Sequence, residues 1–250
     1  MKSKPKFSII TVSYNSVVTI EQTILSVLNQ TYSNIEYIII DGGSTDGTVE
    51  IIRKHEDVIS SWVSEPDKGI YDAMNKGIKL ATGDWVGIIN SDDYYEVDAI
   101  SKIHEAIIGN AGTELVYGNL KFIKENGVTS IYRPICDLDS ICNNMTISHP
   151  TVFIKRSVYE KFGLFDLDYK LTADWELLLR FFKYNVSFFY LNVLIANFRV
   201  GGAGSGFKGI HLNERFRIRH LYSNKKAMYY DFKDLLIFIY FKIFPQKSMF

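Results

Sequence analysis

Two adjacent carboxylates, Asp92 and Asp93, follow a short apolar run that ends at Ile89. Neighbouring carboxylates at the end of a buried strand are costly to leave unpaired, and a divalent cation that also binds phosphate oxygens would satisfy them. The same Ser-Asp-Asp sequence is typical of ordinary turns and helix caps. The pair by itself therefore indicates either a metal-diphosphate site or a cap.

A second acidic turn, Asp41–Gly47, follows the apolar run Ile35–Ile40. Its glycines let backbone approach a ligand closely, so Asp41 is a candidate binding residue, while Ser44 or Asp46 would cap the next helix in any case. The sequence has no Gly-x-Gly-x-x-Gly after its first strand and no Gly-Lys-Ser/Thr loop. Neither a dinucleotide fingerprint nor a P-loop therefore explains the acidic turns.

Short β-branched runs alternate with helical periodicity through the first half of the chain. We expect strands at 7–14, 35–40, 62–63 and 85–89, and helices at 20–28, 48–55 and 70–81. This alternation predicts an α/β fold in which a mostly parallel sheet is flanked by helices. Ligands bind outside the carboxyl ends of the strands in such sheets, so Asn15, Asp41 and the pair Asp92–Asp93 should lie at one edge.

The second half is less regular. We expect helices at 97–108 and 173–184, strands at 115–117, 151–154 and 188–191, a basic helical stretch at 214–220 and an apolar segment at 235–244. Between them, Gly201–Gly206 is rich in glycine and flexible enough to act as a lid.

Charge and composition exclude several classes of protein. The 28 basic residues balance 28 acidic ones, whereas affinity for a nucleic-acid backbone normally needs a basic surplus. At 47% hydrophobic residues the chain is too apolar to be disordered. No apolar signal segment is visible at the start, which predicts a cytoplasmic protein.

Five blocks of the sequence resemble family 2 glycosyltransferases of the GT-A fold. They are Ser8–Asn15, Ile39–Thr48, Ser64–Gly77 with Ala81–Asp84, Asn90–Asp93, and Ser148–Arg156 followed by Phe162–Asp166 and Ala173–Leu177. The first four span most of residues 7–93 in the order and spacing of the family, and the fifth matches its acceptor half. Each block is degenerate alone, but five in order are specific.

The resemblance implies a GT-A-like, Rossmann-type enzyme that transfers a hexosyl or N-acetylhexosaminyl group from a nucleoside diphosphate sugar, UDP-linked by expectation, to a glycan hydroxyl with inversion. It extends to bacterial enzymes of O-antigen, capsule or exopolysaccharide synthesis, whose acceptors are carried on undecaprenyl diphosphate at the inner face of the cell membrane. Two alternatives stay open, an inactive sugar-nucleotide or glycan-binding module and a nucleotidyltransferase. The second is disfavoured because Val12–Ser16 lacks a glycine- and basic-rich loop.

The resemblance also implies a role for individual positions on the donor side. Five residues would bind the nucleotide sugar: Thr11, Asn15, Asp41, Asp67 and Asp92. Among them, Asp41 would recognise the uracil edge and Asp92 would face the ribose or support the metal site. Asp93 would be the direct ligand of a divalent cation, Mg²⁺ or Mn²⁺. Asn90 stands where many relatives carry another Asp, which leaves the ligand set open.

Asp174 matches the catalytic base of the family, at the start of the acceptor-side helix. Here Ala173 stands where relatives often carry Glu. Attack by an acceptor hydroxyl on an anomeric carbon requires removal of its proton, which a positioned carboxylate can accept. The structural alternative is that Asp174 only caps its helix.

Five further residues are candidate contacts to the acceptor or to a phosphate: His149, Trp175, Glu176, Arg199 and His211. Each type also has an ordinary structural role, as a core histidine, a packed aromatic ring or a solvated charge. Closure of the glycine-rich lid would bring His211 forward as an extra metal ligand.

We expect a glycosyltransferase domain over residues 1–222, divided into a nucleotide-sugar half (1–95) and an acceptor half (96–222), and a basic, aromatic tail over 223–250. The apolar stretch 235–244 is about half as long as a membrane-spanning helix. Two interpretations of the tail stay open. Its lysines and aromatic residues favour the surface of an anionic membrane, and its helical pattern equally suits packing on the domain or in a homodimer.

Overall fold

Seven consecutive buried residues form β1 (Phe7–Ser13), the central strand of the first half. It pairs in parallel with β2 (Ile35–Asp41) and with β4 (Trp85–Asn90), and β3 (Ser61–Ser64) adds in parallel to the outer side of β2. The computed structural model describes residues 4–124, 126–134, 137–201, 209–222 and 226–243. Both faces of β1, β2 and β4 are covered, which explains their nearly continuous apolar runs.

The strand order reverses its direction between β1 and β4. The sheet runs β3-β2-β1-β4-β8-β6-β9-β5, so the chain moves outward from β1 to β3 and then returns to the other side of β1. A reversal of this kind opens a crevice beyond the carboxyl ends of the two strands. The side chains of Ser16, after β1, and Ser91, after β4, meet there with their hydroxyl oxygens 2.7 Å apart.

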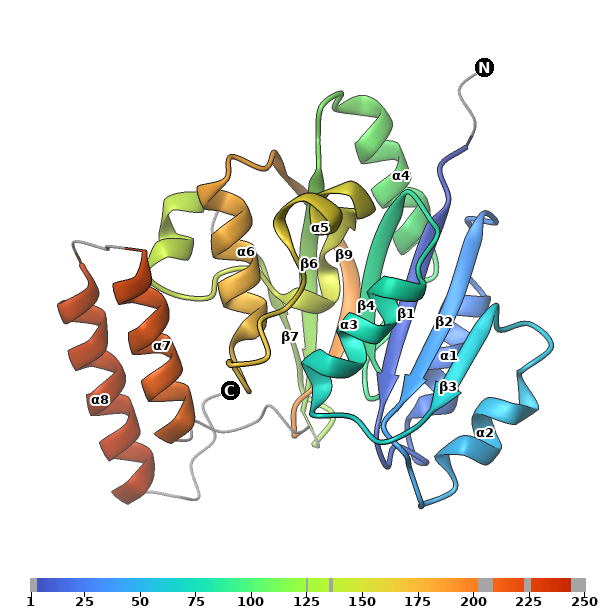
Figure 1. The fold of residues 1–250 in the computed structure, drawn as a ribbon, viewed down its shortest axis with the longest axis horizontal. Coiled ribbons are helices and arrows are strands. Elements are labelled where there is room, and N and C mark those ends of the chain that lie inside the picture. Colours follow the sequence, from blue (N-terminus) through green and yellow to red (C-terminus); the bar gives the residue numbers. More distant parts are fainter. Residues whose placement is uncertain (1–3, 125, 135–136, 202–208, 223–225, 244–250) are drawn as a thin grey trace.

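Alternate residues of β1 enter two different cores. Ile10 and Val12 pack with α3 (Ile70–Leu80) on one face. Phe7 and Ile9 pack with α1 (Ile20–Leu28) and α4 (Ala99–Gly109) on the other. α2 (Thr48–Lys54) lies at the β3 edge of the molecule (Figure 1). The expected helices and strands of this half are confirmed to within a residue or two.

The second half extends the same sheet with strands of mixed direction. β8 (Phe153–Lys155) runs antiparallel to β4 and to β6 (Leu115–Ile123), whereas β6 runs parallel to β9 (Phe188–Arg199). β7 (Thr129–Tyr132) and β5 (Tyr94–Tyr95) add antiparallel pairs. β6 and β9 are both longer than the three- and four-residue runs expected, and β7 was not expected.

The acceptor half ends in helices. α5 (Arg156–Phe162), which was not expected, and α6 (Ala173–Lys183) follow two 3₁₀ turns, Leu138–Cys142 and His149–Thr151. α7 (Gly209–Leu221) and α8 (Ala227–Ile243) form a helical hairpin beside α6 (Figure 1). The expected domain limit at residue 222 falls inside this hairpin, and most of the expected lid, residues 202–206, lies outside the described residues. None of the described helices combines the length and apolarity needed to cross a membrane.

Candidate active site

The loops that follow β1 and β2 are bound to each other. Asn15 adopts a left-handed backbone with φ of 49°, accepts a hydrogen bond from the N–H of Thr45 at 3.0 Å and donates its own N–H to Ser44 Oγ at 2.8 Å. The N-cap of α2 is Gly47, so neither Ser44 nor Asp46 occupies that position, but Asp46 accepts the N–H of Thr48, the first residue of α2, at 3.0 Å. These contacts fix the loops at the edge where a ligand would enter.

Asp41 is fully buried at the end of β2 and accepts five hydrogen bonds. Its Oδ1 accepts from the hydroxyls of Ser13 and Ser44, and its Oδ2 accepts from the hydroxyl of Ser64 and the N–H groups of Gly43 and Ser44. Burial alone would raise the pKa of Asp41, but these hydrogen bonds outweigh it and hold the pKa below its usual value. A nucleobase N–H that reaches this carboxylate has to take the place of one hydroxyl donor.

Thr11 lies inside the sheet. Its side chain is fully buried, and its hydroxyl is 3.0 Å from the phenolic oxygen of Tyr37. The structure thus gives Thr11 a packing position in place of the expected nucleotide contact, because it precedes the carboxyl end of β1 by two residues.

Asp67 comes to the same edge from the loop before α3. Its Oδ1 accepts a hydrogen bond from the N–H of Gly69 at 2.8 Å. A Cβ atom on Gly42 would lie 2.5 Å from Asp67 Oδ2 and 3.3 Å from the ring of Tyr14. Only a glycine at position 42 therefore allows the Asp67 carboxylate to lie against the backbone that follows Asp41.

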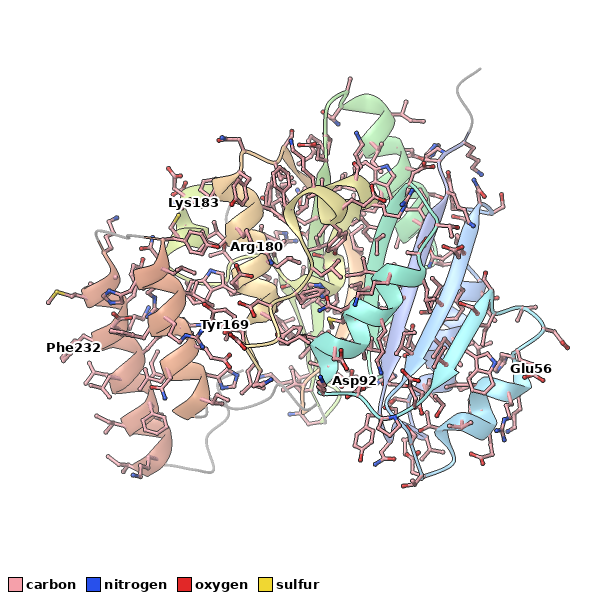
Figure 2. The ribbon with its side chains drawn as sticks, viewed as in Figure 1. Glu56, Asp92, Tyr169, Arg180, Lys183 and Phe232 are labelled. Atoms are coloured by element: carbon pink, nitrogen blue, oxygen red, sulfur yellow. The ribbon has the colours of Figure 1, made fainter. Side chains whose placement is uncertain are left out.

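Asp92 and Asp93 differ sharply in exposure. Asp93 is fully buried, and its Oδ1 accepts the N–H of Arg199 at 3.1 Å, whereas its Oδ2 has no hydrogen-bond partner in the described part of the chain. Asp92 is partly exposed at the carboxyl ends of the parallel strands (Figure 2). Burial and the charge of Asp92 raise the pKa of Asp93 well above its usual value, and burial also raises that of Asp92.

Two carboxylates of this kind fit a divalent cation. Asp93 Oδ2 is buried without a partner, which is costly for an ionised oxygen, and a cation bound beside it by Asp92 and phosphate oxygens would offset its charge. The described residues contain no cluster of three or more His, Cys, Asp or Glu side chains that could hold a metal, and the expected approach of His211 on lid closure stays a prediction. Asp92 is the more exposed of the two carboxylates, so an entering ligand meets it first.

Arg199, the last residue of β9, contacts both Asp92 and Asp93. Its guanidinium donates to the carbonyl oxygen of Asp92 and to Oε1 of Gln22, and it lies over the ring of Tyr94. The side chain is thus tied down with its positive charge beside the two carboxylates. This position suits a contact to a diphosphate.

Asp174 stands in the first turn of α6 and bonds to a residue of the donor half. Its Oδ1 accepts the hydroxyl of Tyr71 at 3.1 Å and the N–H of Trp175 at 2.9 Å. Burial raises the pKa of Asp174 above its usual value, and these hydrogen bonds offset only part of the rise, as does the charge of the nearby His211. A carboxylate with a raised pKa is a better proton acceptor near neutral pH.

Glu214, on α7, fixes the loop that leads into α6. Its side chain is buried, and its carboxylate accepts the N–H groups of Lys170 and Leu171 at 2.6 and 3.1 Å and the hydroxyl of Thr172 at 2.8 Å. Thr172 is the residue immediately before α6. The start of the helix that carries Asp174 is therefore set by a side chain more than 40 residues further along the chain.

Comparison with known proteins identifies the family. The family model described as Glycosyl transferase family 2 matches residues 8–163, which is more than half of the chain. The chain belongs to glycosyl transferase family 2. A PGL/p-HBAD biosynthesis glycosyltransferase of Mycobacterium tuberculosis is 30% identical over 204 residues, covering 79% of this chain and 78% of its own. An uncharacterized glycosyltransferase of the same species is 34% identical over 184 residues, covering 72% and 70%.

Solved structures share the GT-A fold of this glycosyltransferase. TarS of S. aureus in complex with UDP superimposes with a TM-score of 0.69 at 21% identity, covering 86% of this chain and 64% of its own. The mannosyltransferase PcManGT of Pyrobaculum calidifontis, in complex with GDP-Man and Mn²⁺, gives 0.59 at 17% identity and covers 94% and 75%. This chain thus spans just under two thirds of the TarS chain. At these identities the likeness concerns the fold.

Trp175 of this glycosyltransferase packs under α6. It is 1% exposed, donates its indole N–H to the carbonyl of Ile141 at 2.7 Å, and has the guanidinium groups of Arg215 and Arg219 5.2 and 5.5 Å from its ring centre. A buried ring covered by two cations does not offer a face to a sugar. The structure therefore gives Trp175 a packing role in place of the expected acceptor contact.

Glu176 and His149 also have structural surroundings. Glu176 is buried in an ion pair with Arg180 and accepts the hydroxyl of Tyr222 at 3.0 Å. His149 is buried edge-on against Phe165, and burial lowers its pKa to about 4, so it is neutral at physiological pH. Neither side chain is placed for the expected contact to acceptor or phosphate.

Two residues of the site were not expected. Tyr71 falls inside a block that resembles the family, but its distance of 103 residues from Asp174 hides their contact in the sequence. Glu214 appears in the sequence only as one acidic residue of a basic helix, and nothing nearby indicates its loop contacts. Long-range hydrogen bonds thus complete the acceptor side of this glycosyltransferase.

Proposed function

We propose that the enzyme is an inverting glycosyltransferase that uses a UDP-sugar, a divalent cation and Asp174 as general base. The acceptor hydroxyl attacks the anomeric carbon, the bond from that carbon to the diphosphate oxygen breaks, and nucleoside diphosphate leaves with the bonding electrons. Asp174 accepts the hydroxyl proton. Direct displacement of this kind inverts the configuration of the anomeric carbon.

The observation that carries the proposal is the bridge formed by residues 67–71. Asp67 lies against Gly42, in the loops after β1 and β2 that we call the donor loops or donor edge. Tyr71, four residues later in the first turn of α3, donates to Asp174. The bridge holds the candidate base at a fixed position relative to the donor edge. Transfer requires this arrangement, because the acceptor oxygen must reach the anomeric carbon while its proton reaches the base.

A divalent cation would be held by Asp92, with the buried Asp93 beside it, and would neutralise charge on the departing diphosphate. We assign the direct contact to Asp92 because it is the partly exposed carboxylate. Asp93 holds the end of β9 through the N–H of Arg199. The guanidinium of Arg199 adds positive charge on the same side.

Uridine as the donor base rests on Asp41, Asn15 and Asp67 at the donor edge and on the resemblance of the sequence blocks. Asp41 remains ionised far below neutral pH and can only accept hydrogen bonds, which suits the ring N–H of uracil. TarS, which shares the fold, binds UDP in one crystal structure and UDP-GlcNAc in another. The acceptor we propose is a glycan carried on a lipid diphosphate such as undecaprenyl diphosphate, in bacterial surface polysaccharide synthesis at the inner face of the membrane.

The deciding experiment is a panel of UDP-, GDP- and CDP-sugars with soluble glycan acceptors, assayed with Mn²⁺ and with EDTA. We expect release of UDP, dependence on the cation, and a product whose anomeric configuration is opposite to that of the donor by NMR. Binding of UDP-sugars without turnover would point to an inactive binding module, and release of pyrophosphate in place of UDP would point to a nucleotidyltransferase.

A further inference from the structure

The last described helix, α8, exposes a stripe of apolar side chains, while its acidic side chains are buried or half-buried. A surface helix normally turns its apolar side inward and its charged side to water. In α8 the exposed stripe is apolar, and we call it the outer face: Met228, Phe232, Leu235, Leu236, Ile239 and Ile243. Their exposed fractions run from 42% to 82%. Figure 2 shows Phe232 on the side of α8 that points away from the rest of the molecule.

The inner side of α8 carries its acidic residues. Asp234 is 3% exposed and pairs with both Arg215 and Arg219 of α7, and Asp231 pairs with Arg219 and with His220. Arg219 is itself fully buried. Because breaking a buried ion pair is strongly unfavourable, these contacts fix the rotation of α8 about its axis and keep the apolar stripe outward.

The exposed charges of the described hairpin are all basic. Arg217, Lys226, Lys233 and Lys242 are exposed, whereas Glu214, Asp231 and Asp234 are buried or partly buried in the contacts already described. An exposed apolar stripe flanked by cations is complementary to a surface with anionic headgroups over an apolar interior.

We propose that the outer face of α8 docks the enzyme on an anionic lipid bilayer. The helix is 17 residues long, about 25 Å, so it would lie in the headgroup region with its apolar stripe inserted and its lysines at the level of the phosphates. This inference rests on the proposed function for the acceptor, whose lipid carrier would share the same membrane.

A second copy of the chain is a poorer partner for this face. In a two-fold dimer the outer face of one chain would pack against the outer face of the other. Each lysine would then lie near the same lysine, or another lysine, of the second copy. The described hairpin offers no exposed acidic residue to compensate. Anionic lipid headgroups would neutralise the same charges.

The hairpin also reaches the acceptor side of the active site. Glu214 of α7 bonds to the loop that leads into α6, two residues before the base. Docking through α8 would therefore place the membrane next to the acceptor side rather than next to the donor loops, which lie beyond β1 in Figure 1. A lipid-linked acceptor could then reach Asp174 from the bilayer.

The test is flotation of the full chain with lipid vesicles, without donor or acceptor. We expect binding to phosphatidylcholine vesicles that contain about 30% phosphatidylglycerol and little binding to pure phosphatidylcholine. The double variant Phe232→Glu/Leu236→Glu should lower the vesicle-bound to free ratio at least about tenfold, and each of Lys233→Gln and Lys242→Gln should lower it about fivefold.

The matched control is Val58→Glu/Ile108→Glu, which changes two exposed apolar residues on other elements and should bind vesicles like the wild type. Circular dichroism establishes that each variant is folded. Equal binding to neutral vesicles, absence of binding to anionic ones, or a dimer by sedimentation velocity that Phe232→Glu/Leu236→Glu dissociates would overturn the proposal. Because the assay involves no transfer, its failure leaves the proposed reaction with soluble acceptors intact, and failed transfer leaves vesicle binding intact.

Discussion

Asp41 lies at the end of β2 and Asp174 lies in the first turn of α6. The surroundings of these two carboxylates shift their pKa values in opposite directions. Asp41 accepts five hydrogen bonds, three from the turn that follows it and two from the adjoining strands β1 and β3, and its pKa is lowered. Asp174 accepts from Tyr71 and Trp175, and burial raises its pKa. The comparison teaches that surroundings, not residue type, decide whether the pKa of a carboxylate in this molecule is lowered or raised.

The donor edge should be the more sensitive side to loss of charge. We expect Asp92→Asn to lower turnover at least about 10³-fold, since metal stabilisation of a leaving group contributes several kcal/mol. The measurement is UDP release with saturating Mn²⁺, and Asp57→Asn, an exposed carboxylate away from the site, is the control. Turnover close to wild type in Asp92→Asn, with loss only in Asp93→Asn, would return the direct cation contact to Asp93.

The donor half should also carry a large pH-dependent share of stability through Glu36. Burial alone would raise the pKa of Glu36, but hydrogen bonds from Ser8, Thr82 and Lys6 outweigh it and lower the pKa to about 2. The folded pKa lies below the unfolded one, so this stabilisation is complete above about pH 4.5 and disappears as the pH falls towards 2. It amounts to about 3 kcal/mol.

Glu36→Gln should therefore reduce the free energy of unfolding by about that amount at pH 7 and by much less at pH 2.5, as measured by urea denaturation. Glu105→Gln, which changes an exposed carboxylate of α4, serves as the control. An equal loss of stability at both pH values would show that the effect is packing and not charge.

Loss of Glu214 should affect the acceptor side alone. Glu214→Gln keeps the shape of the side chain but removes its charge and part of its accepting capacity for the loop 170–172. We expect kcat to fall about tenfold while donor affinity is unchanged, because the base is displaced and the donor site is not. Steady-state kinetics with calorimetric UDP binding decides this, with Glu160→Gln on α5 as control. A loss of UDP affinity of about tenfold in Glu214→Gln would mean that Glu214 also positions the donor site.

The smallest effect concerns Tyr71. Its hydroxyl lowers the pKa of Asp174, so Tyr71→Phe should raise that pKa further. A base acts in its deprotonated form, and the acid limb of the kcat profile should therefore move to higher pH, with less than about a tenfold change in kcat at the plateau. An unshifted profile would remove Tyr71 from the control of the base.

The donor half could be predicted closely from sequence because its elements are short, local and regular. Apolar runs set β1, β2 and β4, and the glycines of 42–47 mark the turn that follows β2. Thr11 was the exception, because the sequence predicted a nucleotide contact for it. Which strand residues reach the ligand edge depends on where the strand ends, and Thr11 lies inside β1, in contact with Tyr37.

The acceptor half was harder to predict because tertiary contacts decide it. Trp175 and Glu176 directly follow the proposed base Asp174 in sequence but face the interior, where they contact Arg219 and Arg180 respectively. The outward turn of the apolar stripe on α8 likewise follows from ion pairs with α7 that no local pattern indicates. Periodicity located these helices, whereas the direction of their faces came from residues far along the chain.

The most direct test compares Asp174→Asn with Asp41→Asn in one preparation, measuring kcat and UDP affinity for both. We predict that Asp174→Asn lowers kcat at least about 10²-fold while UDP affinity changes by less than about threefold, because a base acts in the transition state and not on bound donor. Asp41→Asn should instead weaken UDP binding. Near-normal kcat in Asp174→Asn, with only a lowered melting temperature, would contradict the account and reduce Asp174 to a helix cap.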